Sequence, residues 1–423
     1  MRTRASFWIF ATATTFLLVA VVTREARFLA LMLPLLAFGA LASLFSPPAP
    51  EVEVRRTTEK EALYEGEEIE VRISLRNTGE PLPFLEVYDA LPHRSVLTRG
   101  TNHLLLALDR DETKRLEYRI QFPLKGRYPV GPVVLRSRDS LGVYLKERRV
   151  PSDEAFVVAP RIEDLRKVSV LPRRTRPRLG QVPSRIPGLG TEFWSIREYH
   201  AGDDLRRVNW KASARLDSLL TNERESERSG DVILVLDARE AANVGFYASN
   251  AVELGIRALA SLASRLLHDR NRVGLVVQRD VMDWVTPGFG RRQLYRIIDT
   301  LIGVRPGGQA PFEQIGWMLK RHLPTKALLV IISPLVDRSV TETIAELRAS
   351  GFDIILLSPS SLEVDRLTIG EDRYENLAYR LLRMQRDGNV GYLRRFAHVV
   401  DWNPDEPLTL ALKEVSLWSR YQP

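Results

Sequence analysis

Two uncharged apolar stretches open the chain, Phe7–Thr23 and Phe28–Phe45. Each approaches the ~20 residues that a helix needs to cross a bilayer, and only Arg24–Arg27 separates them. We therefore predict a transmembrane helical hairpin over residues 1–46, kinked at Pro34. A cleaved signal peptide is the alternative for the first stretch. Against it, a second apolar stretch follows at once and no small-residue cleavage pattern ends the first.

Residues 47–165 alternate between apolar and polar positions. The stretch Glu68–Leu75 alternates strictly and ends at the turn signal Asn77-Thr78-Gly79. Further strands are expected at Glu51–Arg56, Phe84–Tyr88, Leu104–Leu108, Thr113–Phe122, Tyr128–Arg136 and Ala155–Ala159. Short strands at this spacing predict a β-sandwich of immunoglobulin-like type. His93 and His103 have no partner at metal-ligand spacing, so we interpret them as surface residues.

From residue 230 to residue 423, short apolar runs alternate with helical segments. The apolar runs predict buried strands at Val232–Leu236, Arg272–Gln278, Lys326–Ser333, Asp353–Ser358 and Ala397–Asp401. The segments between them predict helices at about Ser249–His268, Arg291–Ile302, Phe312–Leu323, Val340–Ala349 and Tyr374–Arg386, followed by a final helix. Strands that are buried on both faces and separated by helices indicate a doubly wound α/β domain.

Residues 166–229 separate these two domains. Their first part, LPRRTRPRLGQVPSR, is rich in Arg and Pro and has almost no apolar periodicity. It is therefore expected to be an exposed linker. Its arginines either touch an acidic surface or are simply solvated.

Composition narrows the chemistry. The net charge of +8 suits anionic partners, which include the inner membrane leaflet, nucleic acid and acidic proteins. The absence of cysteine excludes disulfides, thiol nucleophiles and thiolate metal sites. No phosphate-binding glycine motif, nucleophile elbow or paired-histidine motif occurs. Because the basic linker has neither interleaved aromatics nor a nucleic-acid motif, nucleic-acid binding is not expected.

The segment EFWSIREYHAGDDLRRVNWKASARLDSLLTNERESE, residues 192–227, closely resembles the signature of the bacterial family known as domain of unknown function 58. The matching positions are Arg197, Glu198, Tyr199, Gly202, Asp203, Asp204, Arg206, Asn209, Trp210, Ala214 and Arg215. FPLKGRYPVGPVVLRSRDSLGVY, from Phe122, resembles the usual end of the family's β domain. The resemblance covers nearly the whole chain and implies a two-helix membrane anchor, a β domain and a von Willebrand factor type A-like domain.

The signature is dense in both charge signs. Asp203 and Asp204 are placed to cap a helix that carries Arg206 and Trp210. These charges either pair internally, which would lock the segment against the α/β domain, or form a docking surface for a partner. Both interpretations stay open.

The resemblance also implies a comparison with metal-binding type A domains, which use an Asp-x-Ser-x-Ser loop, a Thr and a later Asp to hold Mg²⁺. Asp237 is retained here, while Arg239, Ala241, Gln309 and Pro334 stand at the other positions. One carboxylate cannot hold Mg²⁺. Arg239 would instead place its guanidinium where the cation lies and pair with Asp237. We predict neither metal nor cofactor.

The family's members are commonly encoded beside MoxR-type AAA ATPases and transglutaminase-like membrane proteins, which implies an adaptor or chaperone-like role. We therefore expect a non-catalytic interaction protein held in the plasma membrane, with the lipid bilayer and one of these proteins as partners. Positive charge outside the hairpin turn places both chain ends and the folded domains in the cytoplasm. The alternative is an envelope-associated hydrolase that uses Glu198, Asp203 and Asp204 as acid and base.

Overall fold

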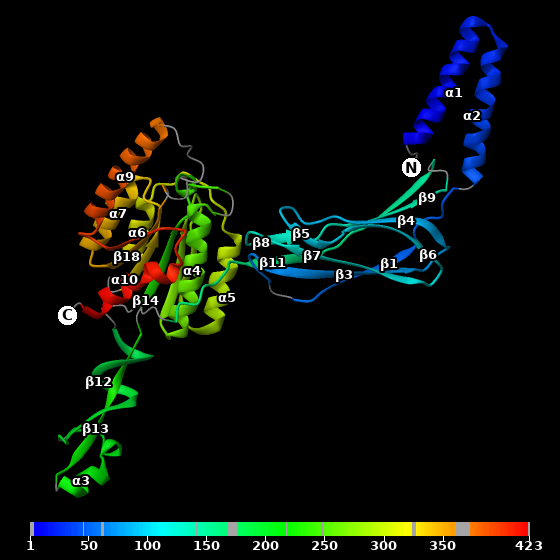
Figure 1. Ribbon diagram of the computed structural model, residues 1–423. Helices are drawn as coiled ribbons and strands as arrows, with labels where there is room; N and C mark the ends of the chain where they lie inside the picture. Colours follow the sequence, from blue (N-terminus) through cyan, green and yellow to red (C-terminus); the bar gives the residue numbers. More distant parts are fainter. Residues whose placement is uncertain are drawn as a thin grey trace. The chain divides into compact units, whose positions relative to one another are not determined.

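A computed structural model of the chain forms two compact units, Met1–Ala159 and Pro160–Pro423 (Figure 1). The structure describes residues 4–44, 46–60, 63–140, 143–166, 176–200, 202–216, 218–229, 231–246, 249–323, 327–360, 362 and 373–421. For residues 176–194 and 224–229 it describes the backbone only. Residues 167–175 of the predicted linker lie outside these ranges.

The N-terminal apolar stretches form two helices, α1 (Arg4–Thr23) and α2 (Ala26–Leu44). Arg24 adopts a left-handed conformation at the turn between them, with φ of 56°. Pro34 lies inside α2. Within the part of the chain that the structure describes, no helix has both the length and the hydropathy required to cross a membrane. The helical hairpin is thus confirmed, and its insertion into a membrane stays a prediction.

The rest of the first unit is rich in β-strands. Described strands form one four-stranded sheet in the order β1-β3-β7-β5, another in the order β10-β9-β4-β6, and a small sheet β2-β11-β8. The strand bounds are Val52–Thr58 (β1), Leu63–Tyr64 (β2), Glu68–Asn77 (β3), Leu82–Asp89 (β4), Val96–Gly100 (β5), His103–Leu108 (β6), Thr113–Gln121 (β7), Gly126–Pro129 (β8), Val133–Arg138 (β9), Leu145–Val150 (β10) and Ala155–Ala159 (β11). Alternate residues of both larger sheets share one apolar core, as the pattern of Glu68–Leu75 predicted.

Arg56 and Asp89 form a buried ion pair in this unit. Asp89 is 1% exposed and accepts hydrogen bonds from Arg56 Nη2 and from Tyr118 Oη, each at 2.5 Å. Burial raises the pKa of Asp89 above its ordinary value, although both partners oppose that shift. The carboxylate is therefore held by two specific donors rather than by water.

The sequence missed three strands of this unit. All residues of β5 are exposed, and β10 reads LKERRV, so neither carries an apolar run. β2 has only two residues. The predicted strand Tyr128–Arg136 is divided between β8 and β9. His103 lies on the surface beside Glu86, as expected.

In the second unit, the described strands build a six-stranded sheet in the order β16-β15-β14-β17-β18-β19. The bounds are Asp231–Asp237 (β14), Arg272–Gln278 (β15), Asp283–Gly288 (β16), Leu328–Ile332 (β17), Asp353–Pro359 (β18) and His398–Trp402 (β19). Neighbouring strands run parallel except β15 and β16. The β16 edge strand was not predicted, because its residues are half-buried and Pro287 interrupts its apolar pattern.

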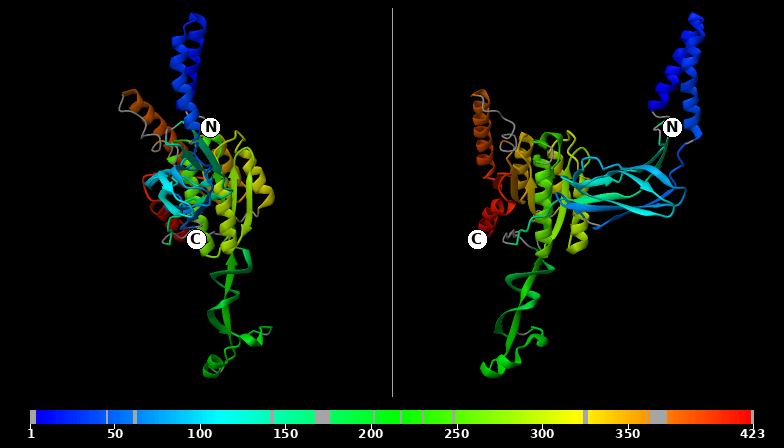
Figure 2. Two further views of the ribbon diagram at one scale, coloured as in Figure 1. Left: turned by 90° about the vertical axis from the view of Figure 1, so that its right-hand side faces the viewer. Right: turned by 45° about the vertical axis from the view of Figure 1, so that its right-hand side comes forward.

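Helices cover both faces of this sheet (Figure 2). One face packs against α4 (Ala251–His268), α5 (Gly290–Gly303) and α10 (Leu408–Tyr421). The other packs against α6 (Glu313–His322), α7 (Arg338–Ala349) and α9 (Arg373–Leu393). The predicted strands and helices of a doubly wound α/β domain are therefore confirmed.

The segment between the predicted domains differs from a linker. Arg176–Glu198 is strand β12, which pairs antiparallel and with several bulges to β13 (Leu220–Ser229). From Arg176 onward the expected exposed linker therefore contains a strand, which its lack of apolar periodicity did not predict. Leu165 is buried in the core of the second unit, so that unit begins earlier than the expected boundary at residue 230.

Candidate functional site

The carboxyl end of β14 is the point at which the chain turns to opposite sides of the sheet. From β14 the chain passes to its neighbour β15, and it returns later to β17 on the other side. In open α/β sheets, ligands bind at such a switch point. Asp237 ends β14, and Ser333 directly follows β17. These two residues define the place where a ligand would be sought.

Asp237 is held by its own loop. Its Oδ1 accepts a hydrogen bond from Arg239 Nε at 2.9 Å, and its Oδ2 accepts one from Arg239 Nη2 at 3.1 Å. Ser333 Oγ donates to Oδ2 at 2.9 Å. The Asp237 and Arg239 side chains are 2% and 5% exposed. This is a buried bidentate pair of the kind that Arg forms with carboxylates, and the sequence suggested it.

The outer edge of the Arg239 guanidinium reaches a second carboxylate. Its Nη1 donates to Asp337 Oδ2 at 3.0 Å and to Ser339 Oγ at 3.4 Å. The guanidinium also lies over the ring of Phe312, 5.1 Å from the ring centre. Burial alone would lower the pKa of Arg239, but the hydrogen bonds and charges of the two carboxylates raise it above its ordinary value. Arg239 is thus a fixed cation.

The other predicted metal-site positions do not meet at this point. Ala241 is exposed in the short helix η2 (Glu240–Ala242). Gln309 is exposed too, and its backbone N–H donates to Asp280 Oδ1 at 2.9 Å. The carbonyl of Pro334 accepts a hydrogen bond from Arg386 Nη1 at 2.9 Å. Only Asp237 and Arg239 of the predicted set are therefore brought together.

The residues present do not suit a divalent cation. Asp237 and Asp337 share one guanidinium, which sits between them and would repel a metal ion. Among the described residues, no three His, Asp or Glu side chains gather as a metal site requires. The predicted absence of a metal rests on this charge arrangement and remains to be measured.

A second candidate site is the signature module, which we define as residues 195–223. Arg197 is its centre. Arg197 Nη1 and Nη2 donate to the two carboxylate oxygens of Asp203 at 2.7 and 2.8 Å. Its Nε donates to Glu223 Oε1 at 2.9 Å, and Ser195 Oγ donates to Glu223 Oε2 at 2.7 Å. The bond from Arg197 and the backbone N–H of His200 lower the pKa of Asp203 to about 2.

The remaining polar residues of the signature module shape its backbone. Asp204 caps the short helix η1 (Leu205–Arg207) by accepting from Arg206 N at 3.0 Å. Asn209 accepts from Ala212 N at 3.0 Å at the start of α3 (Trp210–Leu216). The predicted cap is therefore present for Asp204, whereas Asp203 instead pairs with Arg197. These charges brace the signature module itself, and no described contact ties them to the α/β sheet.

The structure also describes the backbone or the exposure of four other signature positions. Tyr199 bonds Leu219 O through its backbone N–H, at 2.8 Å. Gly202 has φ of 109°, a left-handed region that favours glycine. Glu198 and Arg215 have exposed side chains.

Large apolar side chains of the signature module point to solvent. They are Leu205, Trp210, Leu216 and Leu219, and each is at least half exposed. Basic side chains of Arg206, Lys211 and Arg215 lie among them in sequence and are also exposed. The signature module thus pairs its partly buried Arg197, Asp203 and Glu223 internally, while a group of large apolar side chains stands exposed beside basic ones.

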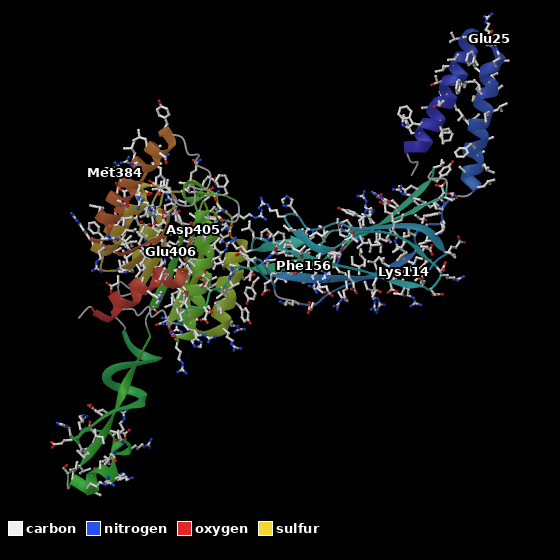
Figure 3. The ribbon with its side chains drawn as sticks, viewed as in Figure 1. Glu25, Lys114, Phe156, Met384, Asp405 and Glu406 are labelled. Atoms are coloured by element: carbon white, nitrogen blue, oxygen red, sulfur yellow. The ribbon has the colours of Figure 1, made fainter. Side chains whose placement is uncertain are left out.

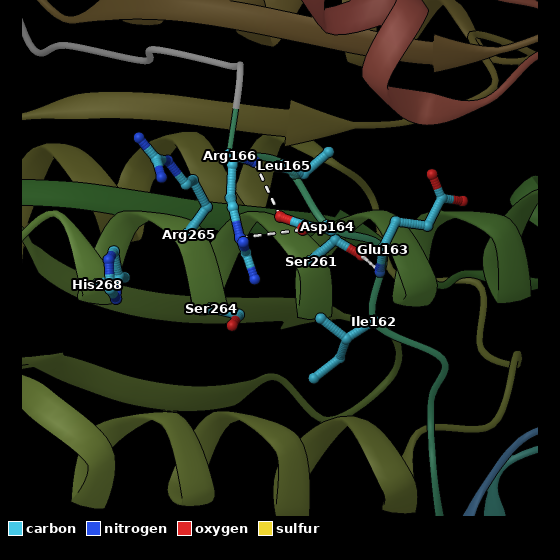
Figure 4. A pocket seen from close by; sticks show the side chains of 9 residues that line it. All are labelled: Ile162, Glu163, Asp164, Leu165, Arg166, Ser261, Ser264, Arg265 and His268. Carbon is cyan, nitrogen blue, oxygen red and sulfur yellow. Dashed lines mark hydrogen bonds and ion pairs between the residues drawn. The ribbon is translucent and has the colours of Figure 1, made fainter.

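A pocket of about 380 Å³ lies where residues 162–166 run along α4 (Figure 4). Ser261 Oγ accepts from Glu163 N at 2.9 Å, and Arg265 pairs with Asp269. Arg166 pairs with Asp164. The side chains of Ser261, Arg265 and Arg166 at this pocket thus serve internal contacts.

The sequence analysis missed several residues of the site at the carboxyl ends of β14 and β17. Ser333, Asp337 and Ser339 follow the apolar run of β17, and a polar loop after a buried strand was the signal available. Arg386 and Phe312 gave no signal, because an arginine in a helix and a phenylalanine beside one are ordinarily explained as a surface residue and a core residue.

Comparisons with known proteins agree with the signature. Residues 195–364 match the family described as "Protein of unknown function DUF58". The "Uncharacterized protein YeaD" of Bacillus subtilis is 24% identical over 247 residues, which cover 57% of this chain and 59% of that protein. The "Uncharacterized protein Rv1480" of Mycobacterium tuberculosis is 28% identical over 155 residues, which cover 35% and 48%. The chain thus spans about half to three-fifths of these relatives.

Among solved structures, the match to Escherichia coli alpha-2-macroglobulin from domain MG7 to the C-terminus has a TM-score of 0.21 and 12% identity, and it covers 26% of this chain and 24% of that one. The match to the cupredoxin domain of amoB from Nitrosocaldus yellowstonii has a TM-score of 0.19 and 9% identity, and it covers 27% and 90%. Scores this low do not establish a shared fold. The chain is therefore similar to DUF58 proteins from the signature module through β18.

Proposed function

We propose that this protein is a membrane-attached, non-catalytic adaptor whose signature module docks a cytoplasmic protein partner. The observation that carries the proposal is the group of exposed apolar side chains on that internally braced module. Arg197, Asp203 and Glu223 satisfy one another, while Trp210 and Leu216 are more than 60% exposed. A rigid scaffold that presents a large aromatic and aliphatic side chains, with basic residues around them, has the composition of an interface hot spot.

The partner that the family resemblance suggests is a MoxR-type AAA ATPase. The exposed basic residues Arg206, Lys211 and Arg215 favour an acidic rim around the partner's apolar pocket. A transglutaminase-like membrane protein is the other candidate from the same resemblance. The signature module offers no phosphate-binding glycine loop, so it would bind such a partner as a protein surface and not through its nucleotide.

The helical hairpin supports attachment to a membrane. Phe7, Trp8, Val22 and Leu33 are each more than 60% exposed, and water would be a poor solvent for such a surface. Lipid would cover it. Both chain ends are proposed to be cytoplasmic from the positive charges outside the turn. A reporter fused after Pro423 that is active only outside the cytoplasm would contradict this topology.

The second unit is proposed to be a von Willebrand factor type A-like domain, and the β unit an immunoglobulin-like one. A parallel sheet with one antiparallel edge strand, and with Asp237 at its switch point, supports the first assignment. In this assignment, Arg239 would stand where the cation lies in metal-binding type A domains. Binding that depends on a metal is therefore not part of the proposal.

The hydrolase alternative is less well supported. A general acid must hold a proton near neutral pH, yet the pKa of Asp203 is lowered to about 2 by its bond from Arg197. Asp204 is used as a helix cap. These two carboxylates serve local structure, which leaves only Glu198 of the proposed catalytic set.

The test measures binding of the full-length protein to the MoxR-type ATPase of the same organism. Replacing both Trp210 and Leu216 by Ala should weaken binding by about 30-fold or more, because even a single interface hot spot contributes at least ~2 kcal/mol. Trp317→Ala, at an exposed tryptophan of α6, is the matched control. The thermal midpoint should stay unchanged in both variants. Absence of binding by the native chain, or equal binding by both variants, would refute the proposal.

The double variant of Asp203 and Arg206 separates the two roles of the signature module. If the thermal midpoint holds while binding is lost, the residues belong to the docking surface. If the midpoint falls with binding, they brace it. If neither changes, the importance assigned to the signature is wrong.

A further inference from the structure

Helix α9 is held to the sheet by one face only. Along that face Arg386, Val390 and Leu393 are buried. Arg386 donates to Pro334 O and to Ser358 Oγ, each at 2.9 Å, and forms an ion pair with Asp401 at 2.6 Å. These contacts sit at the carboxyl ends of the strands, so α9 is fixed as a rigid element rather than loosely attached.

The opposite face of α9, which we call its outer face, carries a regular pattern. Its members alternate at intervals of three and four residues and are Tyr374, Leu377, Leu381, Met384, Gly388 and Gly391. This is the spacing of the a and d positions of a coiled coil. The four large side chains are between 55% and 80% exposed, and Met384 lies on the surface of the helix in Figure 3. An a/d stripe turned to solvent lacks the helix that it normally packs against.

The two glycines give a second, independent indication. A Cβ built on Gly388 or on Gly391 would meet nothing within 4 Å. The fold of a single chain therefore gives no reason for glycine at either position, although glycine weakens a helix interior. Close approach of another chain explains both, because only glycine leaves room for a large side chain directly against the helix backbone.

We propose that the outer face of α9 pairs with the same face of a second copy of this chain, with the two helices antiparallel. Antiparallel coiled coils set a positions against d positions. With Leu381 opposite Met384 of the second copy, the same register sets Leu377 opposite Gly388 and Tyr374 opposite Gly391. Each large residue at one end then meets a glycine at the other end. A surface that complements itself in this way fits a two-fold axis.

Charges on the flank agree with this register. Arg380 and Asp387 are both exposed, and neither forms an ion pair within the described part of the chain. In the antiparallel arrangement, Arg380 of one helix lies within two residues of the level of Asp387 of the other, on the same side of the seam. The two-fold axis repeats this pair. In a parallel pair Arg380 would instead face Gln385, which carries no charge.

The outer face of α9 is a different surface from the signature module and takes a different occupant. The test is the mass of the full-length protein in detergent at micromolar concentration, from sedimentation equilibrium. We expect a dimer. Gly388→Leu should raise its dissociation constant about tenfold or more, because the added side chain overpacks against Leu377 of the second copy. The thermal midpoint of a single chain should not fall, because that side chain enters open space.

Two further variants serve as controls. Tyr295→Arg alters a residue of α5 that is 74% exposed, and it should leave the dimer intact. Arg380→Asp should weaken the dimer, and Arg380→Asp combined with Asp387→Arg should restore it. A native monomer, or a dimer that survives Gly388→Leu, would overturn the proposal.

Cysteine crosslinking tests the register, because the chain has no cysteine of its own. Leu377→Cys combined with Gly388→Cys should give covalent dimers under mild oxidation. The two positions are too far apart along one helix to bridge within a chain. Leu377→Cys alone should give none. Crosslinking by the single variant would show a parallel pair and overturn the antiparallel arrangement.

Discussion

Arg239 forms a bidentate ion pair with Asp237, in which Nε donates a hydrogen bond to Oδ1 at 2.9 Å and Nη2 donates one to Oδ2 at 3.1 Å. The pair is buried at the switch point of a parallel sheet, where α/β proteins commonly bind their ligands. The carboxyl end of β14 is therefore already occupied by a cationic side chain, the guanidinium of Arg239. The signature module and the outer face of α9 are two other surfaces of this unit that present exposed apolar groups.

The pair leads to a prediction about stability. Arg239→Ala should lower the free energy of unfolding by about 3–5 kcal/mol, because it leaves the buried carboxylate of Asp237 without a counterion. Urea unfolding of the full-length protein measures the loss. Arg338→Ala removes an exposed arginine of the neighbouring helix and should cost less than about 0.5 kcal/mol.

A double variant shows whether the uncompensated charge is the cause. Arg239→Met with Asp237→Asn should recover most of the loss, because replacing both members of a buried pair leaves no unpaired charge. If the double variant is as unstable as Arg239→Ala, packing of the guanidinium rather than charge accounts for the effect.

The strands of the α/β sheet could be predicted from sequence because burial on both faces leaves an apolar run. The predicted bounds of β15, Arg272–Gln278, are those of the structure. The same logic failed for β16 and for the paired strands β12 and β13, which have mixed or polar composition. Their pairing depends on backbone hydrogen bonds, and these leave no periodic trace in the sequence.

Contacts of the site between residues close in sequence could be predicted, whereas contacts between residues far apart in sequence could not. Asp237 and Arg239 are separated by one residue at a strand end, so their pairing could be inferred locally. Asp337 reaches Arg239 across 98 positions, and Ser333 reaches Asp237 across 96. Those contacts exist only because β14 and β17 are neighbours in the sheet. In the same way, Arg197 meets Glu223 only through the pairing of β12 with β13.

The pKa of Asp203 leads to a prediction about pH. In the folded protein the pKa of Asp203 is lowered to about 2, from an ordinary value of about 3.9. The stability that its charged form adds to the signature module is therefore fully present above about pH 4 and is lost as the pH falls towards 2. The carboxyl carbon shift of Asp203, followed by nuclear magnetic resonance, should titrate near 2. In Arg197→Ala the midpoint should return towards about 3.9. A midpoint that does not move in this variant would show that the Arg197 bond is not the cause.

The buried carboxylate of the β unit leads to another prediction. Tyr118→Phe removes the hydroxyl that donates to Asp89 and should cost about 1.5–3 kcal/mol, the range for hydrogen bonds to charged groups. Tyr88→Phe, at a tyrosine that is 40% exposed, is the matched control and should be nearly neutral. Both are measured by urea unfolding. Equal stability of the two variants would mean that Asp89 gains nothing from the tyrosine.

The last prediction concerns metal binding at the sheet edge. Millimolar Mg²⁺ or Mn²⁺ should give the native full-length protein no saturable heat and no rise in its thermal midpoint, because the guanidinium of Arg239 already pairs with both Asp237 and Asp337 and repels a metal ion. A ligand that binds only the folded state must stabilise it, by about 0.4 kcal/mol when its concentration equals its dissociation constant. A rise that Asp237→Ala abolishes would reveal a working metal site.

The variant Arg239→Ser tests directly whether the guanidinium occupies a cation position. It leaves two carboxylates and the hydroxyls of Ser333, Ser339 and the introduced serine around the vacated space, and these are the hard oxygen ligands that Mg²⁺ accepts. The variant should be less stable than the native protein without metal, and Mg²⁺ should partly restore its thermal midpoint. Adding Asp237→Asn should cancel that recovery. If Mg²⁺ does not affect Arg239→Ser, the guanidinium does not occupy a cation position, and Arg239 serves only to tie the loop after β14 to the loop after β17.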